Sequence, residues 1–142
     1  MAFLLDIMGY ITYNINEDKI TAGNRRMQFM VAFYEKSDGT KPAAEFLQSL
    51  DNKMRAKMLR TIGLLQEFGG DLREPFLKPL GDGIFELRAQ VGNNISRVLY
   101  FFIVGKRIIL TNGFIKKTQK TPEREIALAK KYRNDYLNDK EV

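Results

Sequence analysis

The sequence predicts an α+β domain: a small antiparallel sheet of about four strands that carries a two-helix hairpin and a C-terminal helix. Residues 84–114 contain three apolar runs separated by glycine-containing turns, which is typical of an antiparallel meander. Residues 42–68 repeat apolar side chains at spacings of three and four, as amphipathic helices do. A basic segment that starts with a proline follows the last strand and predicts the final helix.

The first strand of the sheet is expected over residues 28–34, QFMVAFY, and a polar turn at 37–40 closes it. Pro42 favours the first turn of a short helix, because its missing N–H has no partner there in any case. Asp51 is placed to cap a second helix, which the glycine pair 69–70 ends. The two helices are expected to form an antiparallel hairpin on one face of the sheet.

Residues 71–80 contain two prolines and are expected to be an extended linker. The strands of the meander are expected at 84–91, 95–104 and 107–114. The last helix opens at Thr121, as its cap, with Pro122 in its first turn, and runs to about Leu137.

Residues 1–26 differ in pattern from the rest and are interpreted as an N-terminal extension to a main domain of residues 27–142. Ile11, Tyr13 and Ile15 alternate with polar residues, which favours a short strand or hairpin. At 142 residues and 44% hydrophobic, the chain suits one domain with a substantial core.

The net charge of +6 is unevenly distributed. Residues 106–133 hold nine Lys or Arg against two acids, so the rest of the chain sums to −1. This concentration favours an anionic partner, either nucleic acid or an acidic protein segment. No run approaches the length of a spanning helix, and residues 1–8 lack the basic flank of a signal peptide. A cytoplasmic protein without a membrane partner is expected.

The chain has no cysteine and no histidine, which excludes disulfides and the commonest transition-metal ligands. Glu45, Glu67 and Glu86 do not form an obvious metal site. We therefore expect neither a metal nor another cofactor, and any chemistry must use lysine, arginine, tyrosine or carboxylates.

Two arginines near the first turn of the meander are the main candidates for chemistry. Strand alternation puts Glu86 and Arg88 on one face, and Arg97 opens the next strand. A two-residue loop at 93–94 would place both arginines on the same face, with Arg88 opposite Leu99. A three-residue loop would place Arg88 opposite Val98 and the arginines on opposite faces. The register stays open at this point.

A same-face arginine pair would clamp a phosphate, since guanidinium forks match phosphate oxygens. The alternative is an ordinary cross-strand ion pair between Glu86 or Arg88 and a neighbouring strand, worth about 0.2–1 kcal/mol.

Aromatic and basic residues also suggest contacts with RNA. Phe114 could stack on a base while Lys116, Lys117 and Lys120 contact phosphates, as in single-strand RNA binding. The alternative is that Phe114 closes the core and the lysines are solvated. Tyr100 is a further RNA-binding candidate, although its apolar run favours a core position with the hydroxyl in water.

Lys78 precedes Pro79 and can reach the mouth of the sheet, or can be an ordinary surface lysine.

Four blocks of sequence resemble the phage-derived RelE/HigB-like toxins of bacterial type II toxin–antitoxin systems: EFLQSL (45–50), FLKPLGDGIFELR (76–88), SRVLYFF (96–102) and GFIKKTQKTPEREIALAKK (113–131). The resemblance covers about Phe29 to Tyr136 and implies a RelE-like toxin domain over residues 27–142. It also implies an mRNA interferase that cuts message in the ribosomal A site and inhibits growth. Such toxins are neutralised by a small antitoxin, often a helix-turn-helix protein.

Carried onto matching positions, the resemblance makes Arg88, Arg97, Lys116 and Lys117 the catalytic candidates, and Lys78 matches the lysine before the sheet. These residue types suit metal-independent attack of the RNA 2′-hydroxyl on the adjacent phosphate, with Arg88 stabilising the developing charge and Arg97 assisting. Either Lys116 or Lys117 could move the proton if its pKa is lowered. Some relatives use histidine for this, and its absence leaves the proton-transfer partner open.

Two other functions are compatible with the sequence. One is a non-catalytic basic module that binds RNA or an acidic protein, and the other is a metal nuclease that acts on free RNA.

Overall fold

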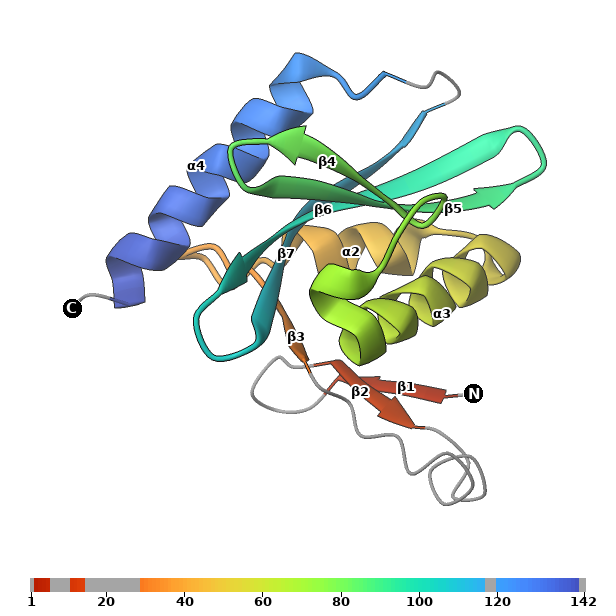
Figure 1. The fold of residues 1–142 in the computed structure, drawn as a ribbon, viewed down its shortest axis with the longest axis horizontal. Helices are drawn as coiled ribbons and strands as arrows, with labels where there is room; N and C mark the ends of the chain where they lie inside the picture. The colour runs from red at the N-terminus through yellow and green to blue at the C-terminus, as the bar shows by residue number, and fades with distance from the viewer. Residues whose placement is uncertain (1, 6–10, 15–28, 117–119, 141–142) are drawn as a thin grey trace.

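The computed structural model describes residues 2–5, 11–14, 29–116 and 120–140, and its elements confirm the predicted α+β class (Figure 1). The main sheet has the strand order β3-β7-β6-β5-β4. Its strands are β3 (Met30–Phe33), β4 (Leu77–Gly81), β5 (Ile84–Val91), β6 (Asn94–Ile103) and β7 (Arg107–Lys116). The helical elements are α2 (Pro42–Ser49), α3 (Asn52–Phe68), the 3-10 turn η1 (Gly69–Asp71) and α4 (Glu123–Lys140).

The sheet is mixed and five-stranded, which corrects the expectation of about four antiparallel strands. Strand β3 runs parallel to β7, with Met30 opposite Arg107. This pairing is possible because the helical hairpin and three strands separate β3 from β7, and parallel neighbours need such a long connection. Strand β4 lies where a linker was expected. Its Pro79 is tolerated because β4 is an edge strand, where a missing N–H costs no ladder hydrogen bond.

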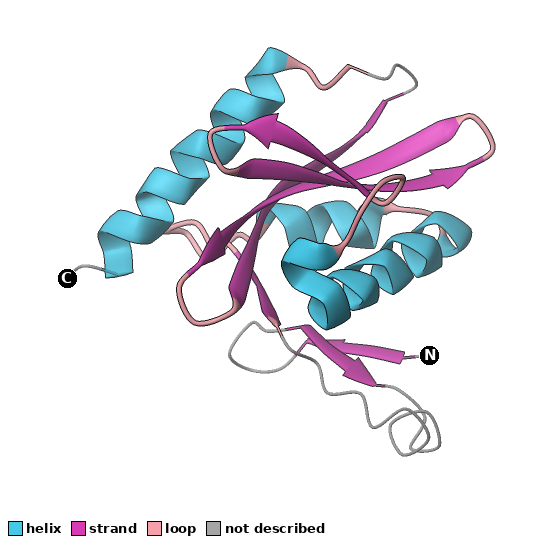
Figure 2. Cartoon of the chain, viewed as in Figure 1, coloured by secondary structure: helices cyan, strands magenta, loops and turns pink. Residues whose placement is uncertain are grey.

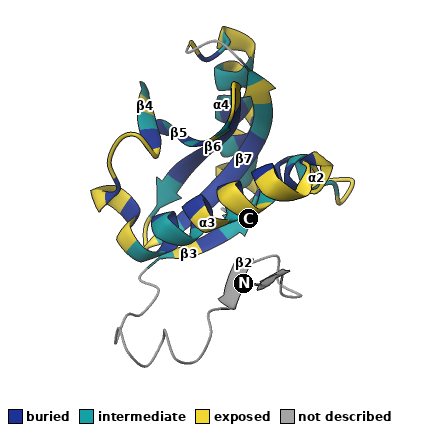
Figure 3. Cartoon of the chain, turned by 90° about the vertical axis from the view of Figure 1, so that its right-hand side faces the viewer, coloured by how far each residue is buried: buried dark blue, intermediate teal, exposed yellow. Residues whose placement is uncertain are grey.

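Helices α2 and α3 form the predicted hairpin and cover one face of the sheet, and α4 packs on the other face (Figure 2). Helix α3 begins as the sequence predicts, because the backbone N–H of Met54 donates to Asp51 Oδ1 at 2.8 Å. The buried side chains of α3 pack against strand residues that include Leu87 and Val98. Figure 3 shows the resulting division between buried strands and an exposed outer surface on the helices.

Gly113 in β7 lets α2 lie close to the sheet. A Cβ at this position would lie 2.3 Å from a ring atom of Phe46, which is well inside van der Waals contact. The neighbours of Gly113 in β7, Asn112 and Phe114, lie on the other face of the sheet, where α4 packs.

Helix α4 is held to the sheet by contacts near both of its ends. The Tyr34 hydroxyl donates to Asp135 Oδ2 at 3.3 Å, and the Tyr34 ring stacks on Tyr132 with centroids 4.6 Å apart. Near the N-terminal end of α4, the side chain of Asn112 on β7 donates through Nδ2 to Glu125 Oε1 at 3.1 Å. These contacts place the start of α4, and the residues just before it, beside β7.

A strand forms in the N-terminal segment where the alternating pattern predicted a short strand or hairpin. Strand β1 (Ala2–Leu5) pairs antiparallel with β2 (Ile11–Asn14). Ile15, the third residue of the alternating pattern, lies outside the described residues. The boundary between a 1–26 extension and the main domain stays a prediction. None of the helices in the described ranges is long and apolar enough to cross a membrane.

The contact between Tyr34 and α4 predicts a loss of stability at high pH. Burial first, and then Asp135, raises the pKa of Tyr34 to about 12. The unfolded chain loses this proton near pH 10, so the stabilisation is complete below pH 10 and is lost as the pH rises through the folded value. Urea unfolding should therefore show stability falling more steeply for the wild type than for Tyr34→Phe between pH 10 and 12. Parallel pH curves would contradict this linkage.

Candidate active site

The first turn of the meander brings Arg88 and Arg97 directly opposite each other on β5 and β6. Its loop is Gly92-Asn93, flanked by the pair Val91 and Asn94, so neither of the two expected registers is correct. Gly92 has a φ of 61°, and a glycine of positive φ at the first loop position is typical of a type II′ hairpin turn. Because glycine is preferred at the first loop position, the loop begins at Gly92 and not at Asn93. Both arginines consequently share one face of the sheet.

The same face carries a row of further candidates across the neighbouring strands. Arg97 lies opposite Phe114, and Lys78 of β4 lies opposite Glu86. Directly opposed residues in antiparallel strands project to the same side. The row therefore joins cationic and aromatic side chains from four strands on the face where α4 also packs.

Lys116 extends this row by one pair, because it lies opposite Ile95 and two residues beyond Phe114 on β7. Lys78 and Lys116 are both partly exposed. Lys120 is exposed and directly precedes Thr121, whereas Lys117 lies outside the described residues.

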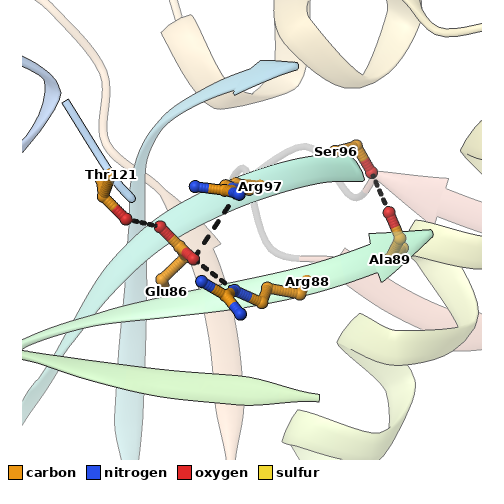
Figure 4. Close-up of polar contacts among 6 residues, drawn as sticks. All are labelled: Glu86, Arg88, Ala89, Ser96, Arg97 and Thr121. Carbon is orange, nitrogen blue, oxygen red and sulfur yellow. Dashed lines mark hydrogen bonds and ion pairs between the residues drawn. The ribbon is translucent and has the colours of Figure 1, made fainter. Parts of the chain in front are cut away.

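The carboxylate of Glu86 is the centre of the polar contacts (Figure 4). Its side chain is fully buried. Oε1 accepts a hydrogen bond from Arg88 Nε at 2.5 Å and lies 3.8 Å from Arg97 Nε. Oε2 accepts a hydrogen bond from the Thr121 hydroxyl. One buried anion thus joins β5, β6 and the segment that leads into α4.

The two arginines differ in their access to solvent. The side chain of Arg97 is 0% exposed, and its guanidinium carbon lies 5.9 Å from the ring centroid of Phe114. Burial lowers the pKa of Arg97, Glu86 opposes that change, and Arg88 adds to it. The side chain of Arg88 is 19% exposed. Arg88 is therefore the member of the pair that a substrate can reach, while Arg97 contributes charge from beneath the surface.

Phe114 is partly buried and packs against the apolar cluster beneath α4, as the core interpretation of this residue expected. Its ring also lies against Arg97, so it closes the site on the β7 side.

The structure contradicts the assignment of Tyr100 to RNA binding. Tyr100 is fully buried in the core beneath α2 and α3, on the face away from the arginines, and its ring stacks on Phe85 with centroids 5.5 Å apart. Within the described ranges its hydroxyl has no hydrogen-bond partner, and burial raises its pKa. The expected water-exposed hydroxyl is also wrong. A bulge after Leu99 changes the pairing, and Tyr100 lies opposite Leu110 inside the core.

Sequence reasoning missed the roles of Glu86 and Thr121. Alternation did place Glu86 on the face of Arg88, but only as one partner of an ordinary ion pair. Thr121 was expected to cap the last helix, yet the helix begins at Glu123 and the Thr121 hydroxyl donates to Glu86. The role of Glu86 could have been inferred from its position two residues before Arg88, because the other side chains of this strand are apolar or neutral.

The arrangement suits the binding of an anion. Within the row, two arginines and two lysines accompany the carboxylate of Glu86, and this local excess of positive charge attracts phosphate. In the part of the chain that the structure describes, no three acidic, histidine or cysteine side chains gather as metal ligands do.

Comparison with known proteins assigns the class. A model of phage-derived Gp49-like proteins matches residues 45–134, from α2 through strands β4 to β7 and into α4. The arginine-bearing sheet, the helical hairpin and this match define a RelE/HigB-like toxin. The chain belongs to the phage-derived Gp49-like family.

Two curated relatives are similar to this chain. Both are described as "Probable endoribonuclease HigB1", from the CDC 1551 and H37Rv strains of Mycobacterium tuberculosis. Each is 36% identical over 93 residues, which is 65% of this chain and 71% of the relative.

The difference in burial between the two arginines predicts different effects on stability. Arg97→Leu should lower the free energy of unfolding by about 3 kcal/mol, because loss of one partner leaves a buried charge poorly compensated. Arg88→Ala should cost less, about 1–2 kcal/mol, because the side chain of Arg88 reaches solvent and Arg97 and Thr121 still face the Glu86 carboxylate. Urea unfolding followed by circular dichroism measures both. Equal losses for the two variants would show that Arg97 is not the structural member of the pair.

Proposed function

We propose that this protein is the toxin of a type II toxin–antitoxin system and acts as an mRNA interferase on translating ribosomes. Membership of the RelE/HigB-like toxins and the endoribonuclease name of its relatives support this proposal. The single observation that carries it is the position of Arg88: a partly exposed guanidinium held on a buried carboxylate, within a row of cations.

The chemistry we propose is metal-independent attack of the RNA 2′-hydroxyl on the adjacent phosphate, which gives a cyclic phosphate and a free 5′-hydroxyl. Arg88 donates to the phosphoryl oxygens, where negative charge develops in the transition state. Arg97 assists through its charge, because its buried side chain does not reach the surface.

Proton transfer in this mechanism is assigned to Lys116 or Lys117. A lysine acts as a base near neutral pH only if burial or neighbouring cations lower its pKa. Lys116 lies on the arginines' face, two residues along β7 from Phe114. The ribosome can supply the remaining acid or base.

The proposed partners follow from the charge distribution and the family. Lys78, Lys120 and Phe114 are the proposed RNA-binding residues around Arg88, and a small antitoxin, of the helix-turn-helix type, would neutralise the protein in the cytoplasm. Residues 27–142 form the proposed toxin domain, and residues 1–26 are an accessory extension. No cofactor is required by this chemistry.

Replacing Arg88 tests the proposal. Arg88→Ala should slow cleavage of message on translating ribosomes by about 10²–10³-fold, because it removes a donor to the developing charge. Arg88→Lys should recover part of the rate, and expression of Arg88→Ala should no longer arrest growth. Primer extension on the message measures cleavage. Arg60→Ala is the matched control, since Arg60 is exposed on α3, which packs on the opposite face of the sheet.

Full toxicity of Arg88→Ala would contradict the assignment of Arg88. Message that is bound but uncut by the wild type would instead favour a non-catalytic basic module. Cleavage of ribosome-free RNA that is lost in excess EDTA would favour a metal nuclease.

A further inference from the structure

We propose that Glu86 is a positioning residue that orients the guanidinium of Arg88 for the phosphate, and that Thr121 in turn fixes the carboxylate. This inference rests on the proposed function and assigns roles to two residues that do not touch the substrate. It makes the reactive arginine part of a three-residue unit built from β5 and from the segment before α4.

The two oxygens of Glu86 have separate partners, and this division restrains the carboxylate. Oε1 faces both arginines, and Oε2 accepts from the Thr121 hydroxyl. Because Glu86 and Thr121 are both buried, at 0% and 4% exposed, water does not compete strongly for these contacts. A carboxylate held at both oxygens cannot rotate without losing one of its partners.

Arg88 is held through Nε, the guanidinium nitrogen that is bonded to the rest of the side chain. A hydrogen bond of 2.5 Å to Glu86 at that atom fixes the plane in which the remaining N–H groups lie. Phosphate recognition by a guanidinium depends on this plane, because two parallel N–H groups must meet two oxygens. A site that is held loosely loses rate even when all its residues are present.

The charges around Glu86 explain why its contact does not neutralise Arg88. Arg97 lies beneath the surface and its Nε is 3.8 Å from the same carboxylate oxygen. One negative charge is therefore shared between two guanidinium groups, and the cluster keeps a net positive charge. Arg88 is oriented by the carboxylate while the site remains attractive to an anion.

Thr121 adds a support from a distant part of the chain, 35 residues beyond Glu86. Its hydroxyl lies two residues before the start of α4, which Asn112 ties to β7 through Glu125. Thr121→Ser would keep the hydroxyl, and Thr121→Val would remove it with little change in volume. This pair isolates the hydrogen bond from the packing of the side chain.

A kinetic double-mutant cycle tests the inference. Glu86→Gln keeps the size of the side chain and removes its charge, and it should slow single-turnover cleavage of ribosome-bound message by about 10²-fold. The concentration of ribosome complex that gives half-maximal rate should change little. In the Arg88→Ala background, Glu86→Gln should slow cleavage far less, because Glu86 acts mainly through Arg88. Equal slowing in both backgrounds would mean that Glu86 has only a structural role and would overturn the inference.

A second measurement does not depend on activity. Hydrogen exchange of the Arg88 Nε–H, followed by ¹⁵N NMR and assigned with Arg88→Lys, should be at least about 10-fold faster in Glu86→Gln than in the wild type. Thr121→Val should raise the exchange rate and Thr121→Ser should restore it. Glu45→Gln, an exposed glutamate on α2, is the matched control and should leave the rate unchanged.

The two measurements separate this inference from the proposed function. A wild type that cuts no message would overturn the proposed function, and the exchange rates would then decide by themselves whether Glu86 holds Arg88. Identical Arg88 exchange in the wild type, Glu86→Gln and Thr121→Val would overturn the positioning role. Circular dichroism establishes that each variant is folded, and Thr121→Val keeps the test available if Glu86→Gln does not fold.

Discussion

The burial of one carboxylate is the constraint on which the rest of the site depends. Glu86 is fully buried, and a carboxylate in that position is tolerated only with cations and hydrogen bonds around it. Arg88 and Arg97 supply the cations because the type II′ turn places them opposite each other. Thr121 supplies the remaining donor. The requirements of this one buried anion therefore bring together β5, β6 and the approach to α4.

The two faces of the sheet differ in composition: one forms the main apolar core, and the other carries the candidate active site. Beneath α2 and α3 the face is apolar, and it holds Tyr100 and the α3 side chains in a continuous core. Beneath α4 the face holds an apolar cluster that includes Leu99 and Tyr132, and the charged row lies beside this cluster, with Leu99 opposite Glu86. A sheet that is buried on one side and only partly covered on the other can be rigid and still present Arg88 to a large substrate.

Local patterns predicted the helices, the meander and the Asp51 cap, because short-range rules of spacing and capping determine these features. They did not predict β4, whose Pro79 is acceptable only at an edge, nor the parallel pairing of β3, which is a property of the whole topology. The catalytic candidates Arg88 and Arg97 were found from their residue type and strand position. The contact between Glu86 and Thr121 was missed because residues 35 positions apart leave no local signal in the sequence.

A double-mutant cycle between Glu86 and Arg97 tests whether the buried carboxylate is stabilised by a buried cation, because it measures their interaction rather than the cost of either residue alone. Glu86→Met, Arg97→Met and the double variant would be unfolded in urea and compared with the wild type. We expect the double variant to lose less free energy of unfolding than the two single variants together, by about 1–3 kcal/mol. Losses that add to within about 0.5 kcal/mol would show that Glu86 and Arg97 do not interact, and the site would then not depend on their pairing.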